Sequence, residues 1–146
     1  MSLHHLIYCS TRSVSSEDSS VIEVNAPALL IEAREKNKKN NVSGLLYFND
    51  YYFLQCLEGS RHAVNMTYNT IVADDRHSDV VLIDYCEIAK RSFSQWDMAY
   101  VSESSLTESL VKLYSGDEKF NPYDMSADSL FQLMQAFKSS LAVIEA

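Results

Sequence analysis

The order in which strand-like and helix-like patterns follow one another constrains this chain more than any other feature of its sequence. Short alternating or continuous apolar runs are typical of strands, and apolar residues three or four positions apart are typical of helices. These patterns predict the order β-α-β-β-α-β-β. The predicted strands cover Leu3–Cys9, Val42–Phe48, Tyr51–Glu58, Val80–Ile88 and Ser94–Val101. We therefore predict an α+β, ferredoxin-like fold in which a five-stranded mixed sheet carries two helices on one face.

The ends of the two predicted core helices carry residues that are typical of helix boundaries. Pro27 fits the first turn of the first helix, whose inward face continues to Asn37. The second helix follows Gly59-Ser60 and closes at residues 74–77, which read Asp-Asp-Arg-His. Between the second and third strands, Asn49-Asp50 predicts a hairpin turn. The Val-Val-Leu-Ile centre of the fourth strand indicates burial on both of its faces.

Two further helices are predicted after residue 101. Leucines mark the first over Leu106–Leu113, and the second carries a broad apolar stripe over Leu130–Ile144. This stripe either covers the free face of the sheet or docks another subunit or an effector protein, and the sequence leaves both open. We predict a core domain over residues 1–101 and a helical extension over residues 102–146.

Composition and charge argue against several classes of function. The chain has 12 Lys and Arg against 20 Asp and Glu, for a net charge of −8, which opposes binding to nucleic-acid phosphates. No apolar run approaches the roughly 20 residues of a membrane span, and no secretory signal is visible, so we expect a cytoplasmic protein. Three widely spaced cysteines predict buried free thiols. His4 and His5 alternate on one strand, so we expect neither a metal site nor, from the other spacings, a catalytic constellation.

Three polar residues lie at inward positions on otherwise apolar faces: Tyr8, Asn37 and Gln55. A buried amide without a partner costs roughly 1–3 kcal/mol, so both amides need partners inside the fold. Backbone groups in loops or at sheet edges could satisfy each of them separately. A planar ligand held between the two core helices in an apolar slot would satisfy all three together.

Five segments follow one another in a recognisable order over residues 3–101. They are L-I-Y-C-S at 6–10, N-x5-S-G at 37–44, F-L-Q-C-L-E-G at 53–59, D-D-R-H at 74–77 and F-S-Q-W-D-M at 93–98. Together they resemble the BLUF domain, a blue-light sensor that uses a flavin. The combination of Q-x-L-E-G with D-x-R-H is the most specific part of the resemblance. Lys36 and Ser43 depart from residues that are common in the family.

The resemblance implies a flavin site and assigns a role to each of its residues. The residues implied to bind the flavin are Tyr8, Asn37, Gln55, Arg76 and His77. Tyr8 would be the photoactive tyrosine, and Gln55 would switch its hydrogen bonds to the flavin. The flavin implied is FAD, which the family most often takes, with FMN or riboflavin as alternatives.

Two further residues, Trp96 and Met98, would relay the switch to the last strand, by the same resemblance. The implied protein is a cytoplasmic photoreceptor without catalytic turnover. It would signal through contacts with an effector protein of unknown identity or with copies of itself, and it would need neither nucleic acid nor membrane. Its resemblance is to short BLUF proteins that carry no enzymatic effector.

Two other classes of function stay open at this point. The first is a non-photic ferredoxin-like regulatory module that binds a small metabolite and oligomerises, and this protein would be colourless. The second is a small hydrolase of the acylphosphatase type, which would need an anion-binding loop near Arg12. The visible spectrum before and after blue illumination separates the photoreceptor from both.

Overall fold

A single mixed sheet organises the protein. The computed structural model describes residues 2–13, 33–94, 98–101, 104–116, 119–140 and 143–144. The strands are β1 (Leu3–Arg12), β2 (Ser43–Phe48), β3 (Tyr52–Ser60), β4 (His77–Glu87), β5 (Ala99–Val101) and β6 (Val143–Ile144). Their order in the sheet is β4-β1-β3-β2-β5-β6. Only the β2–β5 pair is parallel among these strands, so the sheet is mixed as predicted.

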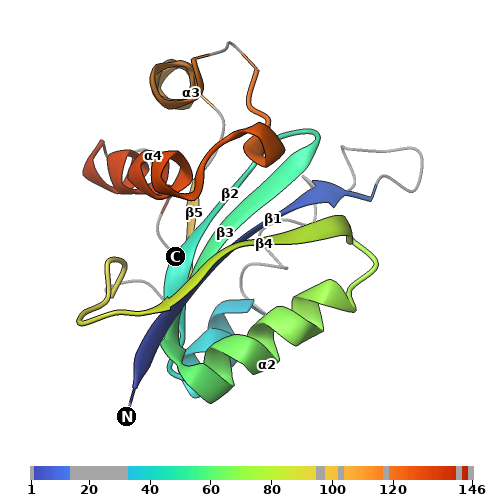
Figure 1. Ribbon diagram of the computed structural model, residues 1–146, viewed down its shortest axis with the longest axis vertical. Helices are drawn as coiled ribbons and strands as arrows, with labels where there is room; N and C mark the ends of the chain where they lie inside the picture. Colours follow the sequence, from blue (N-terminus) through green and yellow to red (C-terminus); the bar gives the residue numbers. More distant parts are fainter. Residues whose placement is uncertain are drawn as a thin grey trace.

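Helices cover both faces of the sheet (Figure 1). Helix α2 (Arg61–Val72) and the helical residues 33–39 lie on one face. Helices α3 (Ser105–Ser115) and α4 (Ala127–Ser139) lie on the other, with a short 3-10 turn, η1 (Pro122–Asp124), between them. The predicted α+β, ferredoxin-like fold with two C-terminal helices is confirmed, and β6 adds a two-residue strand that was not expected. No helix of the described residues is long and apolar enough to cross a membrane.

Strand β1 divides the core into two clusters because its side chains alternate between the two faces. Leu6 and Tyr8 pack toward α2 in one cluster. Ile7 and Cys9 belong to the other cluster, which also contains the buried side chains of α4. The apolar residues at the centre of β1 are therefore buried on both faces of the sheet.

Side chains satisfy backbone groups at the predicted β2–β3 turn and at the start of α2. Asn49 Oδ1 accepts hydrogen bonds from the backbone N–H groups of Tyr51 and Tyr52, both at 2.8 Å, so the β2–β3 turn forms without glycine. The Ser60 side chain caps α2 by accepting a hydrogen bond from Ala63 N–H at 3.1 Å. These contacts fix β3 and α2, which form two walls of the site described below.

Several sequence predictions were wrong in their limits. Helix α4 ends at Ser139 instead of continuing to Ile144, which lies in β6. Helix α2 ends at Val72, and His77 already begins β4. Of the strand expected over residues 94–101, the structure has β5 at residues 99–101, while residues 95–97 are outside the described residues. The predicted start of the first helix at Pro27 is outside them as well.

The prediction that the fourth strand is buried on both faces was also wrong. Strand β4 lies at the edge of the sheet, where Val81 is 42% and Leu82 49% exposed. The helices cover the central strands and leave much of this edge open. Cys86, at the end of the same strand, is exposed too, whereas Cys9 and Cys56 are the buried free thiols that the sequence predicted.

The apolar stripe of the last helix covers the sheet. Its described members are completely buried in the cluster between α4 and the strands: Leu130, Leu133, Met134 and Phe137. These four residues are therefore part of the core and do not form a free docking surface. In α3, by contrast, Leu113 is 73% exposed, and the inward face is formed by Thr107 and Val111.

Candidate ligand-binding site

A cavity of about 230 Å³ lies between the sheet and the helical segments 33–39 and α2. This is near the lower end of the range of small-molecule pockets. Its apolar lining comes from Leu46, Phe48, Phe53, Met66 and Ile71. Its polar lining includes Tyr8, Asn37, Gln55, Asp74, Arg76 and His77. An apolar slot with a few placed polar groups is the usual form of a cofactor site.

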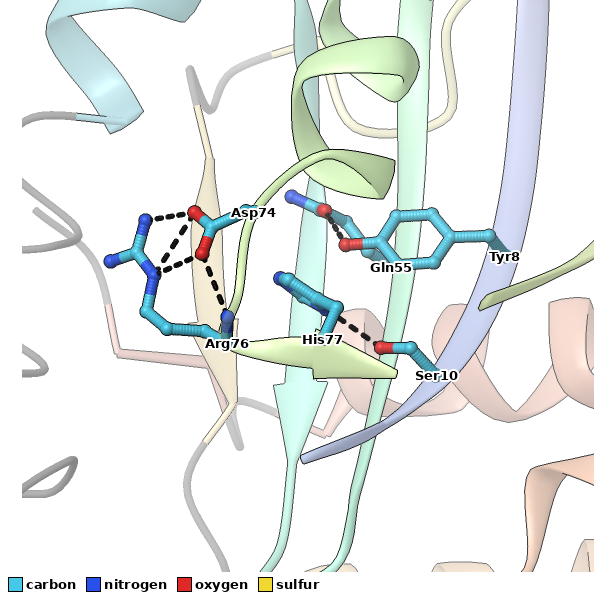
Figure 2. A network of polar contacts seen from close by, with 6 residues as sticks. All are labelled: Tyr8, Ser10, Gln55, Asp74, Arg76 and His77. Atoms are coloured by element: carbon cyan, nitrogen blue, oxygen red, sulfur yellow. Dashed lines mark hydrogen bonds and ion pairs between the residues drawn. The ribbon is translucent and has the colours of Figure 1, made fainter. Parts of the chain in front are cut away.

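A chain of three buried side chains runs along one wall of the cavity. Tyr8 and Gln55 are directly opposite each other on β1 and β3, and the Tyr8 hydroxyl donates a hydrogen bond to Gln55 Oε1 (Figure 2). Gln55 Nε2 in turn donates to Met98 Sδ at 3.2 Å. The register of the sheet thus orients the glutamine, with its carbonyl toward Tyr8 and its amide nitrogen toward Met98.

Burial keeps Tyr8 in its neutral form. Desolvation is the main cause that raises the pKa of this phenol far above its usual value, and the neighbouring Tyr68 adds to the effect. A neutral phenol is a hydrogen-bond donor, which matches the contact to the Gln55 carbonyl.

His77 closes the same cavity from the start of β4. Its Nδ1 lies 2.7 Å from Ser10 Oγ (Figure 2). Its ring lies 4.4 Å from the Phe53 ring, centre to centre. Burial lowers the pKa of His77 to about 4, so the imidazole is neutral at neutral pH. The cavity therefore gains a polar edge here without gaining a charge.

An ion pair lies at the end of α2, where the cavity reaches solvent. Arg76 Nε donates to both carboxylate oxygens of Asp74, at 2.9 and 3.0 Å (Figure 2). The hydrogen bonds from Arg76 lower the pKa of Asp74 to about 2. Asp74 lines the cavity, whereas the adjacent Asp75 is exposed.

Asn37 reaches the cavity from the last turn of helical residues 33–39. The residue is buried, and its backbone carbonyl accepts a hydrogen bond from Val42 N–H at 2.7 Å, which holds the helix end against the start of β2. The structure thus brings Tyr8, Asn37, Gln55, Arg76 and His77 to one cavity, together with Met98. Their roles toward a ligand stay predictions, and Trp96 lies outside the described residues.

Sequence reasoning did not single out several other lining residues. They include Asn40, Thr67 and Thr70. Thr70 lies three residues after Thr67, so both are on the same face of α2. This spacing in the sequence could have indicated that the two residues line the same cavity. Both threonine hydroxyls donate to carbonyls one turn earlier, at 2.8 and 3.0 Å.

Two motif residues, Gly44 and Glu58, help to position the part of the chain around Met98. A Cβ on Gly44 would lie 1.9 Å from the Cys56 carbonyl oxygen and 3.1 Å from Met98 Cε, so only glycine fits. Glu58 is completely buried, and its carboxylate accepts hydrogen bonds from the backbone N–H groups of Ser92 and Phe93, at 2.6 and 2.9 Å. These hydrogen bonds connect residues 92 and 93, which precede β5, to the end of β3.

The hydrolase alternative required an open anion-binding loop near Arg12. Arg12 is instead a buried residue of β1. It is 3% exposed, and its Nη1 donates to the Asn49 carbonyl at 2.6 Å. Its Nε and Nη2 have no hydrogen-bond partner among the described residues. The guanidinium lies 5.4 Å from the Phe48 ring and 6.0 Å from the Phe53 ring, both of which line the cavity.

The fold and the cavity define a ferredoxin-like domain with an apolar slot, lined by a few polar groups, between its sheet and its helices. The sequence pattern of one family, described as sensors of blue-light using FAD, matches residues 3–99. This match covers well over half of the chain, and the chain belongs to the BLUF family.

Comparisons with individual proteins agree with this assignment. The chain is 42% identical over 55 residues to the blue light- and temperature-regulated antirepressor BluF of Escherichia coli (strain K12), covering 36% of this chain and 14% of BluF. It is 27% identical over 94 residues to the photoactivated adenylate cyclase subunit beta of Euglena longa, covering 64% of this chain and 11% of that protein. The chain therefore spans only a small part of both relatives.

A solved structure resembles the whole chain. The structure of BlsA in its photo-activated state superposes with a TM-score of 0.82 at 30% sequence identity, covering 98% of this chain and 96% of BlsA. The similarity thus extends beyond residue 99, into the segment that carries α3 and α4.

Proposed function

We propose that this protein is a blue-light photoreceptor in which Tyr8 and Gln55 switch a hydrogen bond beside a bound flavin and signal through protein contacts. The observation that carries this proposal is the buried Tyr8–Gln55–Met98 chain in the cavity of a BLUF-family protein.

The residues of the slot suit a flavin. When bound, the flavin supplies blue-light absorption and, once excited, a strong oxidant. Leu46, Phe48 and Ile71 provide apolar surface for its rings, while Asn37 and Gln55 provide amides for the polar ring edge. The family description favours FAD, with FMN or riboflavin as the alternatives.

Tyr8 holds the proton that moves. Its raised pKa means that the phenol keeps this proton in the dark. Loss of an electron makes a phenol strongly acidic, and the acceptor already in place is Gln55 Oε1. The proton would pass to Gln55 as the electron goes to the excited flavin, and both would return to Tyr8 when the charges recombine. Gln55 would be left in a changed tautomer or orientation until the dark state recovers thermally.

Gln55 converts this transfer into a structural signal. An amide has distinct donor and acceptor ends, so a change of tautomer or orientation exchanges the groups that face Tyr8 and Met98. In a slot of low dielectric the exchange of a hydrogen bond changes the free energy by more than it does in water. Met98 directly precedes β5, and the contact from Gln55 Nε2 to Met98 Sδ links the switch to this strand.

The signal reaches α4 through the loop that precedes β5. Lys138 Nζ donates to the Ser92 carbonyl at 2.5 Å, and Phe93 is completely buried in the cluster that contains α4. Output by contact, with an effector protein or a second copy, fits this route to the surface and requires no turnover. We also propose that the protein is located in the cytoplasm, as the sequence leads us to expect.

Substitution of the two switching residues tests the proposal. Gln55→Leu and Tyr8→Phe should both bind flavin and remain yellow, but lose the light-induced shift of the flavin absorption spectrum. Gln132→Leu and Tyr51→Phe, which change the same residue types at exposed positions, should shift normally. A normal shift in Gln55→Leu would refute the switch. A protein that is colourless and takes up no added FAD, FMN or riboflavin would refute the photoreceptor.

A further inference from the structure

Three side chains with metal-binding atoms converge on the face of the sheet opposite the flavin slot. They are His5 of β1 and Asp84 and Cys86 of β4. His5 Nε2 lies 2.7 Å from Asp84 Oδ2 and 3.4 Å from Cys86 Sγ, and Asp84 Oδ2 lies 3.9 Å from Cys86 Sγ. The three atoms are thus all within 4.8 Å of one another.

The register of the edge strand produces this arrangement. His5 pairs directly with Cys86 across β1 and β4, and Ile7 pairs with Asp84. Asp84 and Cys86 are two residues apart, so both side chains project to the same face as His5. The His5 ring lies 5.4 Å from the Phe131 ring of α4, centre to centre, which places the cluster on the α4 face.

The geometry does not fit a nucleophilic catalytic relay. In such a relay the two ring nitrogens of histidine serve different partners, one the thiol and the other the carboxylate. Here a single nitrogen, Nε2, approaches both. Nitrogen, oxygen and sulfur atoms that surround one point are instead the arrangement that a metal ion requires.

The surroundings also suit entry of a cation. His5 is buried, whereas the Asp84 side chain is 39% exposed and Cys86 is exposed, so the cluster opens to solvent on one side. A bound cation would offset the negative charge of the Asp84 carboxylate and of the Cys86 thiolate that forms when the metal binds.

We propose that His5, Asp84 and Cys86 form a site for a divalent transition metal ion of the Zn²⁺ class. The ion would be bound by His5 Nε2, an Asp84 carboxylate oxygen and the Cys86 thiolate, with water at the remaining position. The thiol gives its proton to solvent when the metal–sulfur bond forms, and no electron is transferred. Ca²⁺ and Mg²⁺ prefer oxygen ligands, so this donor set selects against them.

Titration of the purified full-length chain, carrying its flavin and no histidine tag, tests the site. Zn²⁺ binding is measured by calorimetry in two buffers with different heats of protonation, which gives the number of protons released. The expected result is one ion per chain with proton release, and Co²⁺ in place of Zn²⁺ should show ligand-field bands at wavelengths longer than flavin absorption.

Ligand variants decide whether these three residues are responsible. His5→Gln, Asp84→Asn and Cys86→Ser should each weaken Zn²⁺ binding by at least about tenfold, while His62→Gln, at an exposed histidine outside the cluster, should not. An unchanged flavin spectrum shows that each variant is folded, because the cluster lies outside the slot. Absence of Zn²⁺ binding, or binding that Cys86→Ser leaves unchanged, would overturn the proposal without affecting the photoreceptor.

Discussion

At the scale of single residues, the slot combines polar groups with very little charge. Burial raises the pKa of Tyr8 and lowers that of His77, so both side chains are neutral at neutral pH. The ion pair of Asp74 and Arg76 lies at the exposed end of α2. Because the Tyr8 phenol and the Gln55 amide are both uncharged, hydrogen bonds between them can be exchanged without separating charge inside the slot.

The pKa of His77 predicts a pH dependence of stability. Burial lowers this pKa from 6.5 to about 4, so between these values the unfolded chain binds a proton that the folded chain does not. The contribution of His77 to the free energy of unfolding is fully present above pH 6.5 and is lost as the pH falls toward 4. The total loss is about 3 kcal/mol. Urea unfolding at a series of pH values measures the slope.

His77→Gln should flatten this slope between pH 4 and 6.5, whereas His62→Gln should leave it unchanged. Asp74 acts in a separate range, because its pKa is lowered from 3.8 to about 2 and its contribution is lost only below the first value. A slope that survives in His77→Gln would show that another group titrates.

At the scale of elements, the close approach of β2 and β3 makes the slot possible. A side chain at position 44 would have no space beside the Cys56 carbonyl, so this position requires glycine. The Glu58 carboxylate binds the backbone N–H groups of residues 92 and 93 at the end of β3. Arg91 adds hydrogen bonds from Nη1 to Ser43 Oγ and to the Glu58 carbonyl, at 2.8 and 3.0 Å. Gly44 and Glu58, which do not line the cavity, thus help to determine where Met98 lies.

Gly44→Ala should therefore destabilise the protein by about 3 kcal/mol or prevent folding, because the new methyl group would overlap a backbone oxygen that cannot move without breaking the β2–β3 pairing. Gly59→Ala is the matched control, since its nearest neighbour would lie at 3.2 Å, and it should cost less. Urea unfolding followed by circular dichroism measures both. Equal stability of Gly44→Ala and the unmodified protein would contradict this account.

At the scale of the whole molecule, the sheet separates two layers with different tasks. One layer, with α2 and residues 33–39, encloses the slot, and the other, with α3 and α4, completes a core on the opposite face. The division into residues 1–101 and 102–146 stays a prediction, although α4 and the central strands share one hydrophobic cluster. Movement of β5 can therefore act on α4 through packed side chains.

Leu133→Ala should destabilise the whole protein by about 2–5 kcal/mol, because this α4 side chain is completely buried against the sheet. Leu113→Ala removes the same atoms from a side chain that is 73% exposed, and it should change stability by less than about 0.5 kcal/mol. Thermal unfolding of both variants provides the comparison. Similar effects of the two would mean that α4 contributes little to the common core.

The sequence by itself determined the fold class, most strand positions and the inward placement of Tyr8, Asn37 and Gln55, because side-chain periodicity is a local property of the chain. It did not determine that Val81 and Leu82 are exposed, that α4 ends at Ser139, or that His5 meets Cys86.

These features depend on which strand occupies the edge of the sheet and on the register between strands far apart in sequence. A local pattern states that a side chain prefers burial, but only the packed structure decides whether another element covers it. The same non-local pairing brings Tyr8 and Gln55, 47 residues apart, within hydrogen-bonding distance.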